Sequence, residues 1–286
     1  MRITKEEGRK AARDALIRAS TTFRPDQIEA YRRSVASEGD EKARWVLETI
    51  LQNAEAAESG KLPLCDDTGI PHVFFEVGDE VELGGDVLVG LSEGVADGLR
   101  DLPGRPMAVR GGDRERLGQT SGLFTESEAL LTAPINIRSI RGSQARVTVL
   151  MLGGGPEIRA KTLRVFHHRQ WEKVIGEAAS WAAQASRELG CTPCVPAIGI
   201  GRTHYEATSL MVEAMKDGDL GVQSGLEEMV TAVVNGVGTG PLGLGGKATA
   251  LGSFVKVGPQ RASGVRIVAM RIGCCFEPRK ATVVLG

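Results

Sequence analysis

Hydrophobic residues recur at helical spacing through the first sixty positions of this chain. Apolar residues at spacings of three and four define one buried face next to Trp45. They are Ala43, Val46, Leu47, Ile50, Leu51 and Ala54. Gly39 and Asp40 mark the boundary with an earlier helix, for which Asp26 is the expected cap. Residues 60–63 then end the helical run just before Cys65.

Alternating and continuous apolar runs predict a sheet in the middle of the chain. A strand over residues 73–77 is expected to end at Gly78, and one helix should follow within residues 84–104. Residues 105–130 are polar and glycine-rich, which indicates a long loop. Strands at 135–140 and 145–152 should form a hairpin through Arg141-Gly142-Ser143.

The strongest helical stripe covers residues 168–189 and ends at Gly190. Further elements are a strand at 195–200, helices at 205–217 and 223–235, and strands at 249–257, 265–272 and 281–285. No internal repeat or linker separates them. The pattern therefore predicts an α+β fold in a single domain over residues 1–286: a helical N-terminal segment of about 60 residues, then a mixed or antiparallel sheet covered by helices.

Composition narrows the classes of function. Hydrophobic residues make up 42% of the 286 residues and charged residues 25%, and the net charge is −1. Such a balance gives no electrostatic footprint for nucleic acid or an anionic membrane. We find neither a signal peptide nor a run of about 18 apolar residues. The sequence predicts a cytoplasmic protein, in which the five cysteines serve as metal ligands or buried hydrophobic residues rather than in disulfides.

Three of the cysteines lie at sharp breaks in the chain. Cys65 precedes Asp66-Asp67-Thr68-Gly69, Cys194 stands between prolines, and Cys275 precedes Phe276-Glu277-Pro278-Arg279. Three thiolates from distant segments can hold an iron–sulfur cluster and leave one iron open to substrate. The alternative is that each cysteine is buried for packing alone.

The remaining candidates allow several interpretations. Cys191 and Cys194 form a C-x-x-C, but no second pair supports a structural zinc site. Neighbouring Cys274 and Cys275 point opposite ways in an extended chain, so only one of them should face a site. Arg279 is either a carboxylate-binding fork or an ordinary surface arginine. His72 is the only histidine near a cysteine candidate.

Glycine is frequent, at 37 of 286 residues, and it clusters. The segments Gly153-Gly154-Gly155, Gly199-Ile200-Gly201 and Gly243-Leu244-Gly245-Gly246-Lys247 could cradle anions, because glycine lets the backbone approach a ligand. None of them has the residues of a dinucleotide or ATP fingerprint.

Five motifs in sequence order resemble the α subunit of the class I iron–sulfur hydro-lyases, the family of class I fumarase and L(+)-tartrate dehydratase. The resemblance spans about residue 10 to the end of the chain. Residues 65–69 read C-D-D-T-G where the family has C-Q-D-T-G, and the triple glycine at 153–155 falls where the family has G-G-G-S-E-N. Residues 193–196 read P-C-V-P, followed by G-I-G-R-T at 199–203, where the family has P-C-P-P and G-I-G-G-T. The chain shares G-L-G-G-K at 243–247 with the family, and C-F-E-P-R at 275–279 matches the spacing of its C-H-A-S-R.

The resemblance implies a 4Fe–4S cluster held by Cys65, Cys194 and Cys275, whose fourth iron binds the substrate. It also implies that Asp67 belongs to the proton-transfer unit. Arg105 falls on a family arginine that grips the substrate carboxylate. The family's β part is absent from this chain, so a separate β subunit is the expected partner.

Three departures bear on the substrate. Asp66 replaces a substrate-contacting glutamine, Ile158 replaces an asparagine, and Arg261 replaces a substrate-contacting histidine. The expected substrate-binding residues are Asp66, Arg105, Arg261 and Arg279. The leading hypothesis is an iron–sulfur hydro-lyase acting on a small di- or hydroxy-carboxylate; the alternatives are a divergent paralogue with another lyase reaction and a metal-free, non-catalytic homologue.

Overall fold

The computed structural model describes all residues, 1–286, and the chain forms two compact units. Unit 1 contains residues 1–23, 54–154 and 279–286, and unit 2 contains residues 24–53 and 155–278. Each unit is therefore built from segments that are distant in the sequence. The expectation of a single domain over residues 1–286 stays a prediction.

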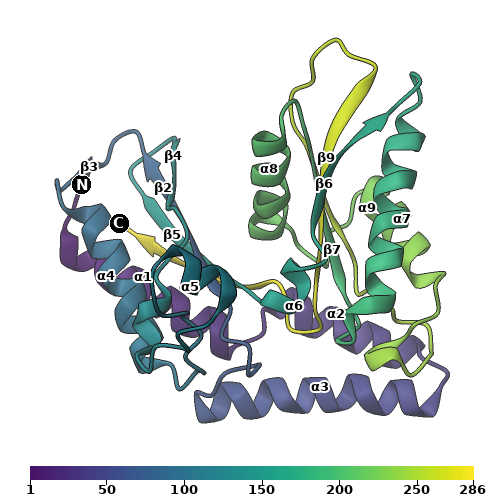
Figure 1. The fold of residues 1–286 in the computed structure, drawn as a ribbon, viewed down its shortest axis with the longest axis horizontal. Helices are drawn as coiled ribbons and strands as arrows, with labels where there is room; N and C mark the ends of the chain where they lie inside the picture. Colours follow the sequence, from purple (N-terminus) through teal and green to yellow (C-terminus); the bar gives the residue numbers. More distant parts are fainter. The chain divides into compact units, whose positions relative to one another are not determined.

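Unit 1 consists of a four-stranded sheet in the order β10-β5-β2-β4, covered by α1 and α4, with a small β1–β3 pair beside it (Figure 1). Its elements are β1 (Arg2–Ile3), α1 (Lys5–Thr21), β2 (Ile70–Gly78), β3 (Glu82–Leu83), α4 (Val87–Asp101), α5 (Asp113–Gly118), η1 (Ser127–Leu130), β4 (Asn136–Ile140), β5 (Ala145–Leu152) and β10 (Arg279–Leu285). Thr4 and Glu7 form a capping box that starts α1. The apolar faces of α1, α4, β2 and β5 together make the core of this unit.

Unit 2 is built on a second four-stranded sheet, in the order β6-β9-β7-β8. Helix α8 packs on one face of the sheet, and α7 with α9 covers the other (Figure 1). The remaining elements of the chain are α2 (Pro25–Ser37), α3 (Glu41–Gly60), α6 (Gly154–Glu157), β6 (Lys161–Phe166), α7 (Trp171–Leu189), β7 (Val195–Gly201), α8 (His204–Asp217), α9 (Gly225–Asn235), η2 (Pro241–Gly243), β8 (Phe254–Val257) and β9 (Val265–Gly273). Helix α3 continues from unit 2 into unit 1 at residue 54.

The α+β class is confirmed, and so are most of the predicted elements. The hairpin at Arg141-Gly142-Ser143 is wrong, because β2 lies between β4 and β5, parallel to β4 and antiparallel to β5. The connection instead caps the end of β2: the Gly78 amide donates to the Gln144 carbonyl, at 2.9 Å. Local turn chemistry did not reveal that an earlier strand occupies the space between the two.

Two smaller expectations also fail. Asp26 is not a helix cap: α2 starts with Arg24 at its N-cap and Pro25 in its first turn, and Asp26 instead accepts the Leu220 amide, at 2.9 Å. The expected strand at 249–257 is ordered as a strand only from Phe254. None of the helices combines the length and apolar character needed to cross a membrane.

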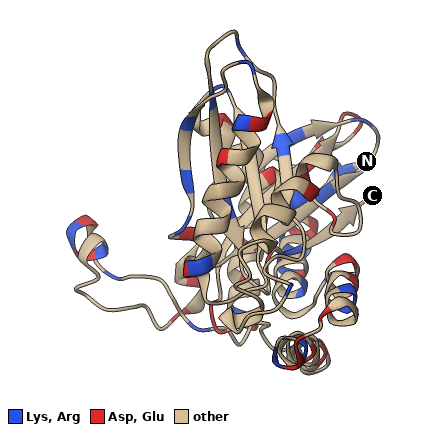
Figure 2. Ribbon diagram, turned by 90° about the vertical axis from the view of Figure 1, so that its right-hand side faces the viewer, with Lys and Arg blue, Asp and Glu red and all other residues tan.

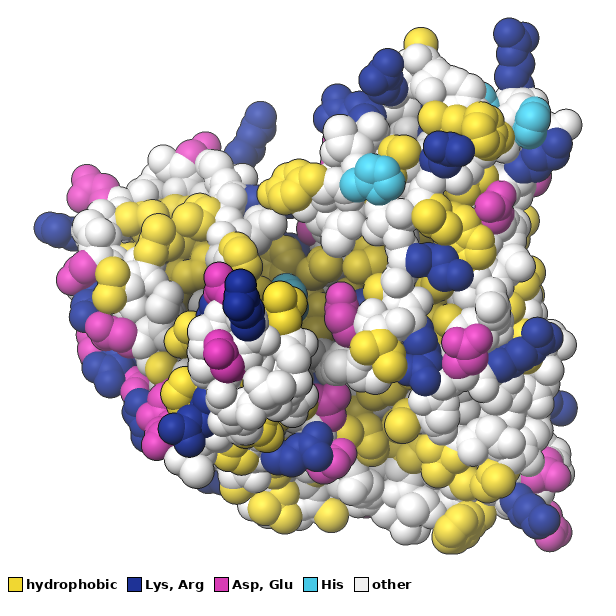
Figure 3. All heavy atoms as spheres, in the orientation of Figure 1, with side chains coloured by type: hydrophobic (Ala, Val, Ile, Leu, Met, Phe, Trp, Pro, Cys, Tyr) yellow, Lys and Arg dark blue, Asp and Glu magenta, His cyan; other side chains and the backbone are white.

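Charged side chains of both signs are interspersed along the helices and over the visible surface (Figure 2, Figure 3). Inside unit 1, Lys5, Arg9 and Arg13 of α1 pair with Glu93, Asp97 and Asp101 of α4. Both members of these pairs advance by four residues, so the two helices run parallel. Helix α1 in turn packs against β10 and β5 of the sheet.

Candidate active site

The Cys65 loop joins the end of α3 to the start of β2 in unit 1. Cys65 is half-buried, and its Sγ lies 3.6 Å from Oδ1 of Asp66. The carboxylate of Asp66 lies 3.7 Å from Nη1 of Arg105, and both side chains are exposed. Two of the predicted substrate-binding residues thus meet beside a predicted cluster ligand.

Asp67 is held by backbone amides rather than by a cation. Its Oδ1 accepts from the Gly69 amide at 3.1 Å, and its Oδ2 accepts from the Gly154 amide at 2.8 Å. The triple-glycine segment therefore lies next to Asp67. Its Gly154 amide and the Gly69 amide together orient the Asp67 carboxylate.

Arg279 lies beneath the same loop, at the first position of β10. Its side chain is 4% exposed, and Nη1 donates to the Asp67 carbonyl at 2.7 Å. Its Nε is buried with no hydrogen-bond partner in the protein. The interpretation of Arg279 as a surface arginine is thus wrong, since it is a buried cation with an unused donor.

Gly69 makes this arrangement possible. Its φ of +79° suits glycine, and a Cβ at this position would lie 2.5 Å from Nη2 of Arg279. A side chain at residue 69 would therefore displace the guanidinium as well as strain the turn.

In unit 2, the strand pairing brings Cys194 and Cys275 to one end of the sheet. Val195 at the start of β7 pairs with Gly273 at the end of β9, so the cysteines that flank these strands lie together. Cys194 is 0% exposed and Cys275 is 2% exposed. The Cys275 amide donates to the Cys191 carbonyl at 2.8 Å, which joins the two cysteine loops directly.

Burial controls the chemistry of these thiols. It raises the pKa of Cys194 to about 12, with a smaller contribution from the nearby Cys274. Burial also raises the pKa of Tyr31 well above its ordinary value, and the neighbouring Cys275, Cys274 and Cys194 add to the shift. Without a metal, Cys194 is therefore a protonated, unreactive thiol. A bound cation would be needed to make it a thiolate.

A buried ion network fixes the segment that carries Cys275. Nη1 and Nη2 of Arg271 donate to the carboxylate of Glu277, and both side chains are 0% exposed. Nε of Arg271 donates to Glu157 at 3.0 Å. Burial alone would lower the pKa of Arg271, but the charges and hydrogen bonds of the two glutamates outweigh it and raise that pKa.

The sequence interpretation missed this network and the Tyr31 contact. A signal for Arg271 was available, because a lone arginine inside an otherwise apolar strand indicates a buried ion pair. Nothing in the sequence around Tyr31 links α2 to residue 275, which lies 244 positions further along the chain.

The two remaining glycine segments make contacts within the protein itself. A Cβ on Gly199 would lie 2.1 Å from the Ala207 carbonyl oxygen, so this glycine allows α8 to pack closely on β7. In the 243–247 segment, the Lys247 amide donates to the buried carboxylate of Glu38 at 2.7 Å. An anion does occupy this cradle, and it is a side chain of the same chain.

The predicted site residues divide between the units. Cys65, Asp66, Asp67, Arg105 and Arg279 belong to unit 1, and Cys194, Cys275 and Arg261 belong to unit 2. Within neither unit do three or more His, Cys, Asp or Glu side chains form a metal-binding group. Arg261 lies on the loop after β8, at the end of the sheet opposite Cys194 and Cys275. His72 lies on β2, where Nδ1 is 3.0 Å from the Ile70 carbonyl oxygen.

Known proteins are similar in sequence to this chain, two of the three named here over more than nine tenths of it. A family model described as fumarate hydratase (Fumerase) matches residues 9–284. A putative L(+)-tartrate dehydratase subunit alpha of Methanocaldococcus jannaschii is 25% identical over 92% of this chain and 91% of its own. The L(+)-tartrate dehydratase subunit alpha of Escherichia coli O157:H7 is 22% identical over 93% of this chain and 86% of its own. Fumarate hydratase 2 of Leishmania major is 28% identical over 67% of this chain, which corresponds to 33% of that protein.

The class of protein follows from these matches together with the α+β fold: the chain is an enzyme of the hydro-lyase class. Within that class, it belongs to the fumarate hydratase (Fumerase) family.

Proposed function

We propose that this chain is the cluster-bearing α subunit of an iron–sulfur hydro-lyase. It adds or removes water on a small di- or hydroxy-carboxylate of the fumarate, malate or tartrate type, and a separate β subunit completes the enzyme. The names of two relatives as alpha subunits support the partner. Their names and the family match support the reaction class.

The observation that carries the proposal is that Arg279 is buried and its Nε has no hydrogen-bond partner. A guanidinium that is 4% exposed and has an unsatisfied Nε needs an anion, because a buried unpaired donor costs about 1–3 kcal/mol. It lies against Asp67, two residues from Cys65. A substrate carboxylate is the anion that a hydro-lyase of this family would supply, and the planar fork of arginine suits it.

The cysteines suit a 4Fe–4S cluster. Cys65, Cys194 and Cys275 would supply its thiolate ligands, and thiolates are the ligands that such clusters use. When bound, the cluster supplies an open iron that acts as a Lewis acid. The burial of Cys194 and Cys275 would exclude water from two of the ligands.

Asp67 and Asp66 take different parts in this proposal. Asp67 is oriented by the Gly69 and Gly154 amides, so it can hold a proton-transfer group of the β subunit in one position. Asp66 is an acceptor-only carboxylate that already shares Arg105. A substrate hydroxyl can donate to Asp66, whereas fumarate has no hydroxyl to donate. This favours a hydroxy-carboxylate over fumarate, and Arg261 remains a substrate-binding candidate by position in the sequence alone.

The first experiment tests the cluster. Anaerobic reconstitution with ferrous iron and sulfide should give a brown protein with a broad thiolate-to-iron absorption band. A triple variant with Cys65, Cys194 and Cys275 replaced by serine should bind no such cluster, whereas Cys191→Ser, the matched control, should bind it fully. The same iron content in the triple variant would rule out this ligand set. Near-zero iron in well-folded wild-type protein would favour a metal-free homologue.

The second experiment tests the substrate. The reconstituted chain with its β subunit should hydrate or dehydrate at least one of fumarate, malate and tartrate, with the hydroxy acids preferred. Asp66→Gln should shift the preference toward fumarate. A full cluster without turnover of any of the three would favour a divergent lyase reaction. The feature that supports this alternative is Asp66, an acid where the family has a glutamine.

A further inference from the structure

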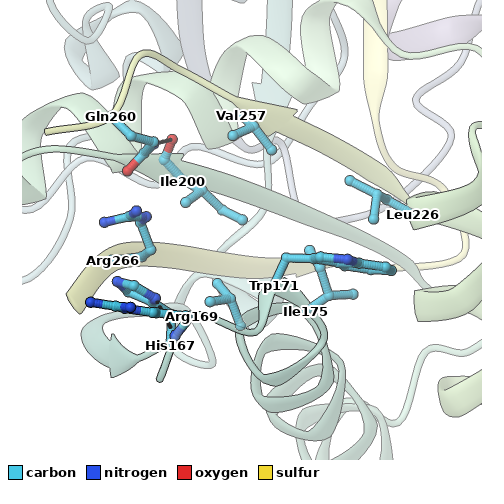
Figure 4. A pocket seen from close by; sticks show the side chains of 10 residues that line it. His167, Arg169, Trp171, Ile175, Ile200, Leu226, Val257, Gln260 and Arg266 are labelled. Atoms are coloured by element: carbon cyan, nitrogen blue, oxygen red, sulfur yellow. Dashed lines mark hydrogen bonds between the residues drawn. The ribbon is translucent and has the colours of Figure 1, made fainter. Parts of the chain in front are cut away.

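A cavity lies in unit 2, at the end of the sheet away from Cys194 and Cys275. Its volume is about 560 Å³, which is within the range of small-molecule sites. The walls come from the start of α7, from α9, from the ends of β7 and β8, from the start of β9 and from the loops that follow β6 and β8 (Figure 4). No predicted site residue lines it.

The cavity is apolar along most of its length. The apolar lining consists of Trp171, Val174, Ile175, Ile200, Leu226 and Val257. Trp171 is 54% exposed and Val257 is 51% exposed, although both are large hydrophobic residues next to a well-packed core. Burying these two side chains against a ligand would be favourable, since burial gains about 25 cal/mol per Å² of apolar surface.

The polar side chains gather at one end. Figure 4 shows Arg169, Arg266, His167 and Gln260 on one side of the cavity and Trp171 with Leu226 on the other. No Asp or Glu lines the cavity, and neither arginine makes an ion pair. The polar end therefore carries two uncompensated positive charges.

His167 holds the Arg169 turn in place. Its Nδ1 accepts from the Arg169 amide at 2.9 Å, and its Nε2 lies 2.6 Å from the Ser263 carbonyl oxygen. The ring therefore anchors the Arg169 turn to the loop that precedes β9. His168 and Arg169 have φ values of 48° and 61°, a conformation that is costly for residues other than glycine. This strained turn presents Arg169 on one side and Trp171 on the other.

An apolar slot with two guanidinium groups at one end matches one kind of ligand. We propose that this cavity binds an amphipathic monocarboxylate, with the carboxylate at Arg169 and Arg266 and an aliphatic tail along Trp171, Ile200 and Leu226. A dicarboxylate of the type proposed as substrate would place its second charge against the apolar wall. The site is thus distinct in chemistry from the proposed active site and does not depend on the cluster.

Calorimetric titration of the full chain with butyrate, hexanoate, octanoate and decanoate tests the proposal. Affinity should rise roughly threefold to fourfold with each added methylene until the slot is filled, as the transfer free energy of a methylene requires. Octanamide, which has the same tail without the charge, should bind roughly tenfold or more weakly than octanoate. Equal binding of the amide and the acid, or no binding of any of them at millimolar concentration, would overturn the proposal.

Variants locate the binding. Val257→Trp fills the cavity from an exposed position and should abolish octanoate binding, and Arg169→Gln with Arg266→Gln should weaken octanoate but not octanamide. Arg164→Gln is the matched control, because its guanidinium lies over the Phe166 ring, 5.7 Å from its centre, and does not line the cavity. Octanoate binding that survives Val257→Trp would place the ligand elsewhere and refute the site. Light scattering on the same samples completes the test: self-association that Val257→Trp removes would identify a second copy of the chain as the occupant, and would likewise overturn the carboxylate proposal.

Discussion

The hydroxyl of Tyr31 donates a 2.6 Å hydrogen bond to the backbone carbonyl of Cys275, and both residues are fully or almost fully buried. Because Tyr31 belongs to α2, this contact fastens the cysteine loop after β9 to a helix from the start of unit 2. The position of the Cys275 thiol therefore depends on a residue from a distant segment of the chain.

Tyr31→Phe should weaken this attachment without emptying the core. The Cys275 carbonyl loses this hydrogen bond, so we expect a loss of about 1 kcal/mol in the free energy of unfolding, measured in urea. The reconstituted variant should also release iron to a chelator faster than the wild type. Tyr205→Phe is the control, since Tyr205 is 83% exposed and should change neither quantity. Unchanged stability and iron release in Tyr31→Phe would show that the loop is held by other contacts.

The Arg271–Glu277 pair should be costly to break from one side only. Arg271→Met removes the buried counter-ion of the Glu277 carboxylate, and we expect a loss of about 3–5 kcal/mol in the free energy of unfolding. Arg271→Met combined with Glu277→Leu should recover much of that loss, because neither charge then remains. Denaturant unfolding of the wild type and of these two variants checks this. The exposed pair Arg202–Glu206 is the comparison, and breaking it should have far less effect. A double variant no better than Arg271→Met would contradict the electrostatic explanation.

Gly69→Ala should act on Arg279. The new Cβ would collide with Nη2, so the guanidinium must move, and the KM for the substrate should rise by roughly tenfold or more, with a smaller effect on kcat. Gly142→Ala is a suitable control, because its φ is also positive, at +103°, but the space around it is open. A similar loss of substrate affinity in both variants would mean that turn strain, not displacement of Arg279, is responsible.

Thiol reactivity should follow burial. In the cluster-free protein at pH 8, iodoacetamide should modify the exposed Cys191 and the half-buried Cys65 well before Cys194. A thiol whose pKa is about 12 is almost entirely protonated at that pH, and Cys194 is also inaccessible. Peptide mass spectrometry of timed samples measures the order. Early modification of Cys194 would show that its loop opens readily.

Glu38 should make stability depend on acid. Burial raises its pKa, but the amides of Asp40, Lys247, Ala248 and Gly39 outweigh this and lower it. A lowered folded-state pKa means that the stabilisation is complete above the unfolded pKa of about 4.3 and is lost as the pH falls through the folded value. Glu38→Gln should therefore be less stable at neutral pH, and the difference should shrink in acid. Urea unfolding at several pH values checks this; a constant difference would exclude the charge as its origin.

The sequence predicted most of what depends on local pattern. The stripes of α3 and α7, the ends at Gly60 and Gly190, and the apolar strand β7 are where the periodicity placed them. The hairpin failed because strand pairing is set by packing over the whole sheet: β2 pairs with both β4 and β5, and a turn sequence carries no information about a third strand.

The candidate site could likewise be predicted only in part, because motifs are local and strand pairing is not. Motif order was enough to select Asp67 and Arg279, which contact each other, and Asp66 and Arg105, which form an ion pair. It did not reveal that Arg279 is buried or that Gly154 orients Asp67, because both depend on which strands are neighbours. The Glu38 cradle could not be inferred either, since glycine-rich sequence does not specify which anion it binds.

The interleaving of the two units along the chain limits how this protein can be taken apart. Strand β10 pairs with β5 in unit 1, although 126 positions separate Leu152 from Pro278 and most of them form unit 2. A protein chemist who wants either half alone therefore cannot obtain it by cutting at one bond. Isolating unit 1 would require new joints, with Phe23 linked to Ala54 and Gly154 linked to Arg279, and only such a rewired gene would report whether the Asp67 loop and its buried guanidinium assemble by themselves.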